Sequence, residues 1–531
     1  MAIEGSVQIN VPESNSNIEQ EKKPKLSWDE IIEKSLSNFG WMDFLQAVLV
    51  AVAMFFDAQQ SFISIYTDNY PKWHCTNTNT NSSCSSSSDI CKLPRSSWSW
   101  DTHPSNTIIS HWNLECASTF IIGLPQSSFF IGCLLGSTFL AALADSSIGR
   151  KNMLIFSCVS MSITSMVIIF STNVWIYSAL KFLIGFWRSS IGTCVLVLLT
   201  EKVNAEWRFR VGIVEYFTFT MGYMSLPGLA YINRNSSWKT LYLYSSIPTL
   251  CYSIIAYLFV NESPRWLVMQ SREKEILKML KRVSSEENAD DGNINLASNL
   301  PKLPTKENFS IFQLYSSVGE LFHKRWAIIR MIAVMILGIG IGMVYFGMPL
   351  AVGNLGFNIY LAVVFSASME FPSCVATYFL ENYRRKPSIL VFSILGGICC
   401  VMCVVFENRV PAAKVVLAMV AFFGACTAYN VFLIYIIELF PTCVRNTTTS
   451  LVRQAIVFGC IFCPFLISAG RKNNIFSYGV FGAVIMLSNF TLLCLPETKG
   501  IVLCDTMDQQ EKKEIALCDA INQEKTGIVS V

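Results

Sequence analysis

Long apolar runs alternate with polar segments along most of the chain. Each run is long enough to cross about 30 Å of hydrocarbon as a helix. A polar segment at 261–326, rich in Lys, Glu and Ser, divides the runs into two groups of six. The pattern predicts an all-α integral membrane protein with twelve transmembrane helices in two six-helix bundles. The predicted spans lie near 42–66, 119–143, 153–170, 174–199, 211–231, 240–260, 327–349, 355–379, 387–406, 411–439, 449–470 and 474–495.

The composition favours the membrane class and argues against several others. Charged residues make up 15% of the 531 residues, whereas a soluble domain usually has about 25%. Mean hydropathy is +0.43. The net charge of +3 is too small to indicate a nucleic-acid partner. Residues 1–39 lack the short apolar core of a signal peptide, so none is predicted. No metal-type Cys/His cluster and no nucleophile–base constellation is found, so we expect neither a cofactor nor an enzyme.

Basic residues in the short loops set the predicted orientation. Arg150-Lys151 and Arg384-Arg385-Lys386 fall on the same side as the N-terminus and segment 261–326. The positive-inside rule therefore places both termini and that segment in the cytoplasm. The predicted divisions are a tail at 1–40 with an amphipathic helix on the membrane surface, an N-terminal bundle at 41–260, a connector at 261–326, a C-terminal bundle at 327–496 and a tail at 497–531.

The loop at 67–117 is then extracellular or lumenal. It is rich in Ser, Asn and Thr and carries four cysteines, which are Cys75, Cys84, Cys91 and Cys116. An oxidising compartment would allow two disulfides, with three pairings open. The alternative is a flexible, reduced loop. Asn81 begins a glycosylation sequon in the same loop.

Acid–base clusters repeat between the two halves. Glu201 is followed by Arg208 after the fourth span, and Glu438 by Arg445 after the tenth, an offset of 237 residues (201 to 438). Two further clusters recur at offsets of 236 (145 to 381) and 235 (262 to 497). A six-plus-six duplication is the architecture of a secondary transporter, whose solute site lies between the halves.

Acids and arginines at the inner helix ends would pair across the halves when the inner face is shut, and separate when it opens. The alternative is that they only mark topology. The gate candidates are Asp145, Arg150, Glu201, Arg208, Glu262, Arg265, Glu381, Arg385, Glu438, Arg445 and Glu497.

These motifs resemble the major facilitator superfamily. The sequence at 141–151, ending Gly149-Arg150-Lys151, resembles the signature loop between its second and third spans. The stretches 262–267 and 496–500 are shared by sugar porters and organic ion transporters. The Cys-rich first loop, 438–446 and 345–370 resemble the organic cation/anion/carnitine family. Phe55 to Gln60, Trp73-His74-Cys75 and 505–508 resemble its plant branch.

The resemblance implies the major facilitator fold, with two pseudo-symmetric bundles, and alternating-access transport of organic cations such as carnitine and polyamines. The expected partners are a small organic cation or zwitterion and the lipid bilayer, without nucleic acid, and the chain is expected to be a monomer. The plasma membrane and the vacuolar membrane both fit the topology. A sugar or phosphate porter is an alternative, although 341–350 carries no Gln. A transporter-like sensor is another, with a tail of only 35 residues after Pro496.

Ionisable side chains inside the spans are candidates for function, because each costs about 2.5–3.5 kcal/mol at the bilayer centre. Glu370 would attract an ammonium group, and the family resemblance implies that a Glu there lines the cation site. Its alternative is a packing pair with a neighbouring Arg or Lys. Tyr345 and Phe346 match cavity positions of the family, where a ring would bind a cation, or else they only pack.

Asp57 and Arg453 complete the set of candidates. Asp57 would contact substrate or bind a coupling proton, or else pair with Arg188 or Lys181. All four His lie outside the spans, which excludes a histidine relay. Arg453 would hold a substrate carboxylate, or else anchor the cytoplasmic end. Val457 stands where animal relatives carry a charged selector, so their specificity does not transfer directly.

Overall fold

The computed structural model consists of helices and one two-stranded hairpin over the residues that it describes. Those residues are 28, 32, 36, 40–76, 84, 89–144, 148–203, 205–272, 275–276, 319, 321–406, 411–441, 443–471, 474–500 and 507–512; the side chains of 141–142, 144, 205–206, 208–210, 411, 446 and 474 are not described.

The N-terminal half holds the first six predicted spans. A short α11 (Pro264–Met269) follows them. In order, the span elements are α2 (Trp41–Phe62) with α3 (Ser64–Thr67), α5 (Thr119–Ala144), α6 (Arg150–Val167) with η3 (Ile168–Phe170), α7 (Val174–Arg188) with α8 (Ile191–Glu201), α9 (Ala205–Ile232) and α10 (Trp238–Phe259).

The C-terminal half holds the other six. In order, the elements are α14 (Arg325–Leu350) with η5 (Ala351–Leu355), α15 (Ile359–Ser368) with α16 (Glu370–Leu380), α17 (Arg385–Val405), α18 (Pro411–Leu439), α19 (Arg445–Cys460) with α20 (Cys463–Gly470), and η6 (Asn474–Phe476) with α21 (Tyr478–Ser488) and η7 (Asn489–Cys494).

All twelve predicted spans coincide with helical segments. Ten segments of the described chain are long and apolar enough to cross a membrane. The remaining two predicted spans fall on α9 and on the shorter apolar helix Tyr478–Cys494. The predicted membrane class is therefore confirmed.

Helix pairing follows the same scheme in both halves. In the N-terminal half α2 packs on α9, α6 on α10, and α5 on α7. The equivalent spans pair in the C-terminal half, where α14 packs on α19, α17 on α21, and α16 on α18. The repeat seen in the sequence is thus a structural repeat.

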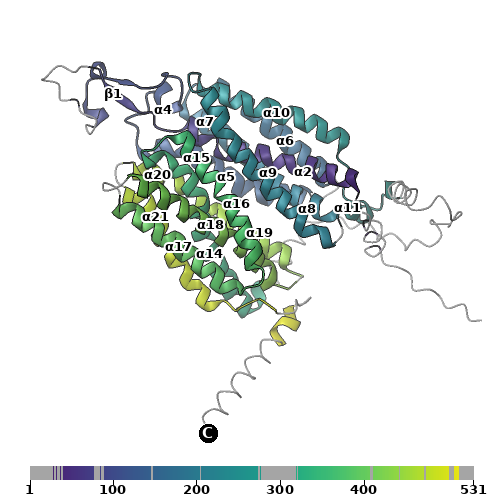
Figure 1. The fold of residues 1–531 in the computed structure, drawn as a ribbon. Helices are drawn as coiled ribbons and strands as arrows, with labels where there is room; N and C mark the ends of the chain where they lie inside the picture. Colours follow the sequence, from purple (N-terminus) through teal and green to yellow (C-terminus); the bar gives the residue numbers. More distant parts are fainter. Residues whose placement is uncertain are drawn as a thin grey trace, which may run out of the picture.

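The two halves meet through four equivalent spans. Helix α5 packs on α19 and α20, and α9 packs on α15 and α16. Figure 1 shows the halves side by side, the first in purple to teal and the second in green to yellow. We call the end that carries the hairpin the hairpin end, and the end that carries α11 and the start of α14 the connector end.

The segment between α3 and α5 forms a small domain at the hairpin end (Figure 1). Strands β1 (Trp73–Cys75) and β2 (Trp98–Trp100) pair antiparallel, with Trp73 opposite Trp100. Short helices η1 (Ile90–Lys92), η2 (Arg95–Ser97) and α4 (Ile108–His111) follow or flank them. Ile90, Trp98 and Trp100 form its own buried cluster.

The described part of the N-terminal tail packs on the connector end. Trp28, Ile32 and Leu36, spaced four residues apart, cluster with Trp266 and Leu267 of α11. The described apolar residues of the predicted amphipathic helix therefore contact α11.

Candidate functional site

Glu370 lies where the eighth span is broken. Helix α15 ends at Ser368 and α16 begins at Glu370. Pro372, in the first turn of α16, has no N–H to donate to the preceding turn, which favours a break at this point. The break places the carboxylate at the N-terminal end of α16, where the helix dipole favours negative charge. The side chain is 5% exposed.

Both halves donate hydrogen bonds to this carboxylate. The Thr220 hydroxyl of α9 donates to Glu370 Oε2 at 2.5 Å. The Tyr345 hydroxyl of α14 donates to Oε1 at 3.4 Å. No Arg or Lys of the described residues forms an ion pair with Glu370. The packing-pair alternative is therefore not what the structure contains, and a cation would find only neutral donors at the carboxylate.

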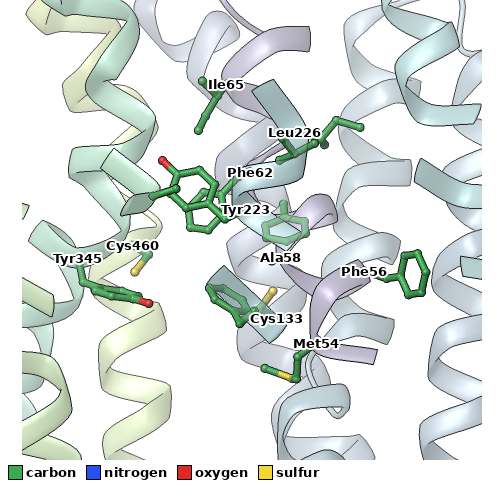
Figure 2. Close-up of a cluster of buried hydrophobic side chains, with 14 of the residues drawn as sticks. Met54, Phe56, Ala58, Phe62, Ile65, Cys133, Tyr223, Leu226, Tyr345 and Cys460 are labelled. Atoms are coloured by element: carbon green, nitrogen blue, oxygen red, sulfur yellow. The ribbon is translucent and has the colours of Figure 1, made fainter. Parts of the chain in front are cut away.

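Aromatic rings cluster around Tyr345, whose hydroxyl donates to the carboxylate. Tyr345 stacks on Tyr429 with centroids 4.4 Å apart and an interplanar angle of 8°. Phe346 packs edge-on against Tyr345 at 5.0 Å, and against Phe130 of α5 at 5.9 Å. Figure 2 shows Tyr345 facing the N-terminal half across this interface. Tyr345 therefore contacts Glu370 directly, and Phe346 contacts Tyr345.

Asp57 is held by an arginine of the same half. Arg188 Nε donates to Asp57 Oδ1 at 2.6 Å, and Nη2 donates to Oδ2 at 2.5 Å. Asp57 is 1% exposed. Of the two partners that the sequence allowed, the structure selects Arg188 and not Lys181. Arg188 ends α7, immediately before the break at Ser189–Ser190 that separates α7 from α8.

Arg453 is partly buried in α19 and does not contact Glu370 through any described hydrogen bond. Its Nε is buried without a hydrogen-bond partner among the described residues. Glu215 of α9 lies within electrostatic range of it. Glu215 was not among the residues predicted from the sequence, although it is a carboxylate inside the apolar span predicted at 211–231. Val457 packs at the margin of the main core.

The acid–base residues of the N-terminal half bond to one another at the connector end. Arg150 Nη2 lies 3.8 Å from Glu201 Oε1. The Ser263 hydroxyl donates to the other oxygen of Glu201. Glu262 accepts two hydrogen bonds from the Lys151 backbone N–H, at 3.0 and 3.1 Å. Glu262 thus binds the N-terminus of α6, a favourable place for an anion.

The C-terminal half repeats this arrangement with equivalent residues. Arg385 Nη2 lies 3.1 Å from Glu438 Oε1. The Thr498 hydroxyl donates to Glu438 Oε2 at 2.7 Å. Glu497 accepts from the backbone N–H groups of Arg385 and Lys386, at 2.9 and 3.2 Å, and so binds the N-terminus of α17. The described gate pairs therefore join residues within each half, and none joins the two halves.

The other gate candidates are less well defined. Glu381 is exposed and follows α16, where its carbonyl accepts from the Arg385 guanidinium at 3.1 Å. Arg445 begins α19, and its Nε and Nη2 are buried without a hydrogen-bond partner in the described part of the chain. Arg265 lies in α11 and is half-buried. Asp145 and the side chain of Arg208 lie outside the described residues.

At the hairpin end the four predicted cysteines form two disulfides. Cys75 pairs with Cys84, and Cys91 with Cys116. This is one of the three pairings that the sequence left open. The predicted glycosylation site Asn81 lies outside the described residues.

Contacts between the halves gather at the hairpin end. The Arg471 guanidinium lies 3.5 Å from the ring centroid of Tyr70. Tyr66 stacks on Tyr360 with centroids 5.7 Å apart. Figure 1 shows the halves diverging from there toward α11 and α19.

Comparisons with known proteins agree with this architecture. The profile of the family described as "Sugar (and other) transporter" matches residues 37–507. The chain is 48% identical to organic cation/carnitine transporter 3 of Arabidopsis thaliana, covering 92% of this chain and 94% of that protein. It is also 48% identical to organic cation/carnitine transporter 2 of the same plant, with the same coverage.

The chain belongs to the organic cation/carnitine transporter family of the major facilitator superfamily. Mouse solute carrier family 22 member 3 is 29% identical over 78% of this chain and 73% of its own length. The inward-open structure of the xylose transporter XylE from E. coli has a TM-score of 0.61 at 16% identity, covering 86% of this chain and 96% of that one. That likeness establishes the twelve-helix fold. As a member of this family the protein is a membrane transporter and not an enzyme.

Proposed function

We propose that the protein carries small organic cations across its membrane by alternating access, with Glu370 as the contact for the cationic group. The observation that carries the proposal is the buried Glu370 carboxylate, which accepts hydrogen bonds from Thr220 of one half and Tyr345 of the other. A carboxylate in an apolar span is costly. Its position at the interface of the halves is where a transported solute must pass.

The rings beside Glu370 suit an ammonium or quaternary ammonium group. A desolvated cation over a ring face gains about 2 kcal/mol. Tyr345, Tyr429 and Phe346 form one cluster of rings next to the carboxylate contact. A cation there would replace the neutral Thr220 donor with a full opposite charge, which strengthens the interaction with Glu370.

Carnitine and polyamines are the substrates that we propose. The names of the Arabidopsis relatives refer to organic cations and carnitine. Carnitine also carries a carboxylate, for which Arg453 is the candidate contact, because its Nε is buried without a described partner. Glu215 beside Arg453 would moderate this contact.

The arrangement of the two halves supports an inward-facing state. The halves contact each other at the hairpin end through Arg471 and Tyr70 and through Tyr66 and Tyr360. The described acid–base pairs at the connector end stay within each half. We infer from the positive-inside rule that the connector end is cytoplasmic and the hairpin end is extracellular or vacuolar. One chain supplies both halves of the site, so we infer that the monomer is sufficient.

Uptake into proteoliposomes tests this function. The purified protein is reconstituted, and uptake of labelled carnitine and labelled cadaverine is measured for wild type, Glu370→Gln and Glu275→Gln. Gln keeps the size of Glu370 and an oxygen for Thr220, so the fold should persist while the charge is lost. Glu275 is exposed and pairs with Arg272, outside the site, and serves as the matched control.

We expect wild type and Glu275→Gln to take up at least one substrate. Uptake by Glu370→Gln should be at least tenfold weaker, which corresponds to a loss of about 1.4 kcal/mol in the interaction between the carboxylate and the cation. No uptake of either substrate by wild type would contradict the substrate class. Equal uptake by Glu370→Gln and wild type would contradict the role of Glu370.

A further inference from the structure

A further carboxylate, that of the half-buried Asp68, lies outside the central site, directly after α3. Asp68 Oδ1 accepts hydrogen bonds from the Thr67 hydroxyl at 2.8 Å and from the Tyr177 hydroxyl at 2.7 Å. Asp68 Oδ2 is buried and has no hydrogen-bond partner among the described residues. One oxygen of this carboxylate is therefore anchored, and the other is left to bind something else.

Asp68 lines a small cavity of about 80 Å³ between the halves at the hairpin end, which has both polar and apolar lining residues. Ser64 and Gln126 line it from the N-terminal half, and Ser468 and Arg471 from the C-terminal half. The side-chain oxygens of Ser64, Gln126 and Ser468 are also buried without a described partner. A space of this size holds more than one water molecule, and water would satisfy these oxygens.

A chain of polar groups leads from Asp68 into the N-terminal half. The hydroxyls of Tyr177 and Tyr242 lie 2.8 Å apart. The ammonium of Lys181 lies 5.9 Å from the Tyr177 ring and 5.6 Å from the Tyr242 ring. Lys181 is 1% exposed and its Nζ has no hydrogen bond to a described residue. Lys181 and Asp68 are within electrostatic range, so each is the nearby counter-charge of the other.

Asp68 is better placed to exchange a proton than Asp57 and Glu370. Both oxygens of Asp57 are bound by Arg188, and protonation would break two charge-assisted hydrogen bonds. Both oxygens of Glu370 accept hydrogen bonds. Only Asp68 of these three has an oxygen without a described partner on the lining of this cavity.

We propose that Asp68 is the proton-binding carboxylate that couples transport to a pH gradient. When the halves part at the hairpin end, the cavity joins the solvent on that side, and a hydronium ion transfers its proton to Asp68 Oδ2. A new O–H bond forms and one water molecule is released. When the halves close again, the neutral carboxyl is sealed in the cavity. This inference deepens the proposed function and rests on it.

The groups that face Asp68 set how readily it takes the proton. Burial raises the pKa of its carboxyl, while the Lys181 ammonium of α7 and the Tyr177 and Thr67 hydroxyls lower it, and the net direction is upward. Arg471 lines the cavity from the C-terminal half, with its guanidinium over the Tyr70 ring. Parting the halves exposes the carboxyl to water and lowers its pKa, so it is protonated there when the hairpin side is acidic, and closing the halves raises the pKa again and holds the proton.

Gradient-driven uptake and exchange separate coupling from folding. In proteoliposomes with the hairpin side acidic, labelled carnitine or cadaverine should accumulate through wild type and through Asp101→Asn. Asp101 is an acid of the hairpin domain that pairs with His74, and it is the matched control. Asp68→Asn should lose accumulation and keep the exchange of labelled for unlabelled substrate without a gradient. Accumulation by Asp68→Asn at the wild-type level would overturn the proposal.

A second variant keeps the test decisive if Asp68→Asn also loses exchange. Tyr177→Phe removes one hydroxyl that stabilises the charged carboxylate and leaves the ring. It should raise the pH of half-maximal uptake by on the order of 1 unit, and an unchanged midpoint would overturn the proposal. A wild-type protein that exchanges substrate but ignores the pH gradient would refute the coupling alone. Absence of both activities would instead refute the proposed function.

Discussion

The buried pair of Asp57 and Arg188 gives the sharpest test of the packing within the N-terminal half. Asp57→Asn removes the charge that balances the Arg188 guanidinium, whose side chain is only 16% exposed. The nearest described substitute is the Cys133 sulfur, 3.9 Å from Nη1, which is a weak acceptor. Removing one partner of a buried ion pair costs about 3–5 kcal/mol, because the other charge stays buried and unpaired.

This cost should appear as a lower unfolding temperature in detergent. A domain of roughly 200 residues shifts by about 2–4 °C for each kcal/mol, so Asp57→Asn should lower the midpoint by roughly 6–20 °C. Asp57→Asn combined with Arg188→Gln leaves two neutral amides that can hydrogen-bond, and should recover at least half of the loss. Glu275→Gln, which breaks an exposed pair, should stay within about 1 kcal/mol of wild type.

The double variant decides whether the reasoning holds. If it is as unstable as Asp57→Asn alone, the single variant was not destabilised by an unpaired charge. If Asp57→Asn itself melts with wild type, the guanidinium is better solvated than its contacts indicate. Either result would refute the assignment of Asp57 as the charge that holds Arg188 between α2 and α7.

Three further predictions use other parts of the fold. Gly185→Ala should destabilise the protein by about 1–3 kcal/mol, because its Cβ would overlap the backbone of α5. Gly228→Ala has open space around its Cβ and should leave the stability unchanged. Thermal unfolding in detergent measures both. Burial lowers the pKa of His111, which accepts a hydrogen bond from Trp238. The stabilisation from neutral His111 is therefore present at neutral pH and is lost as the pH drops below about 6.5. His111→Gln should flatten this pH dependence of the melting temperature. Glu201→Gln and Glu438→Gln should each cost about 1–3 kcal/mol, and a loss in only one of them would contradict the equivalence of the two clusters.

The architecture was predictable from the sequence because the bilayer imposes it. A segment inside hydrocarbon must satisfy its backbone groups within a helix, which requires a long apolar run. The boundaries moved where charged residues extend a helix beyond its apolar part. Helix α6 begins at Arg150 and α14 at Arg325, each a few residues before the predicted span.

Partners inside the bundles were harder to predict, because packing selects among several chemically equal choices. The sequence offered Arg188 and Lys181 to Asp57, and only the helix positions decide for Arg188. Asp68 stood one turn or less beyond the predicted end of the first span, at 66, and was therefore placed in a loop. Glu215 lies near the start of the span predicted at 211–231, close to Arg208 and the other charged residues of the helix end.

The acid–base clusters at the connector end indicate which bonds must break when that end opens. Each half carries a complete set, in which a glutamate binds the N-terminus of α6 or α17 and an arginine pairs with a second glutamate. Because these bonds lie within a half, the halves can part there without breaking them. We infer that the clusters hold each half together and that closure of the connector end uses groups outside these pairs. Arg445, with two buried nitrogens that lack a described partner, is such a group. The repeated acid–base motifs of the sequence thus correspond to bonds within each half, and not to bonds between the halves.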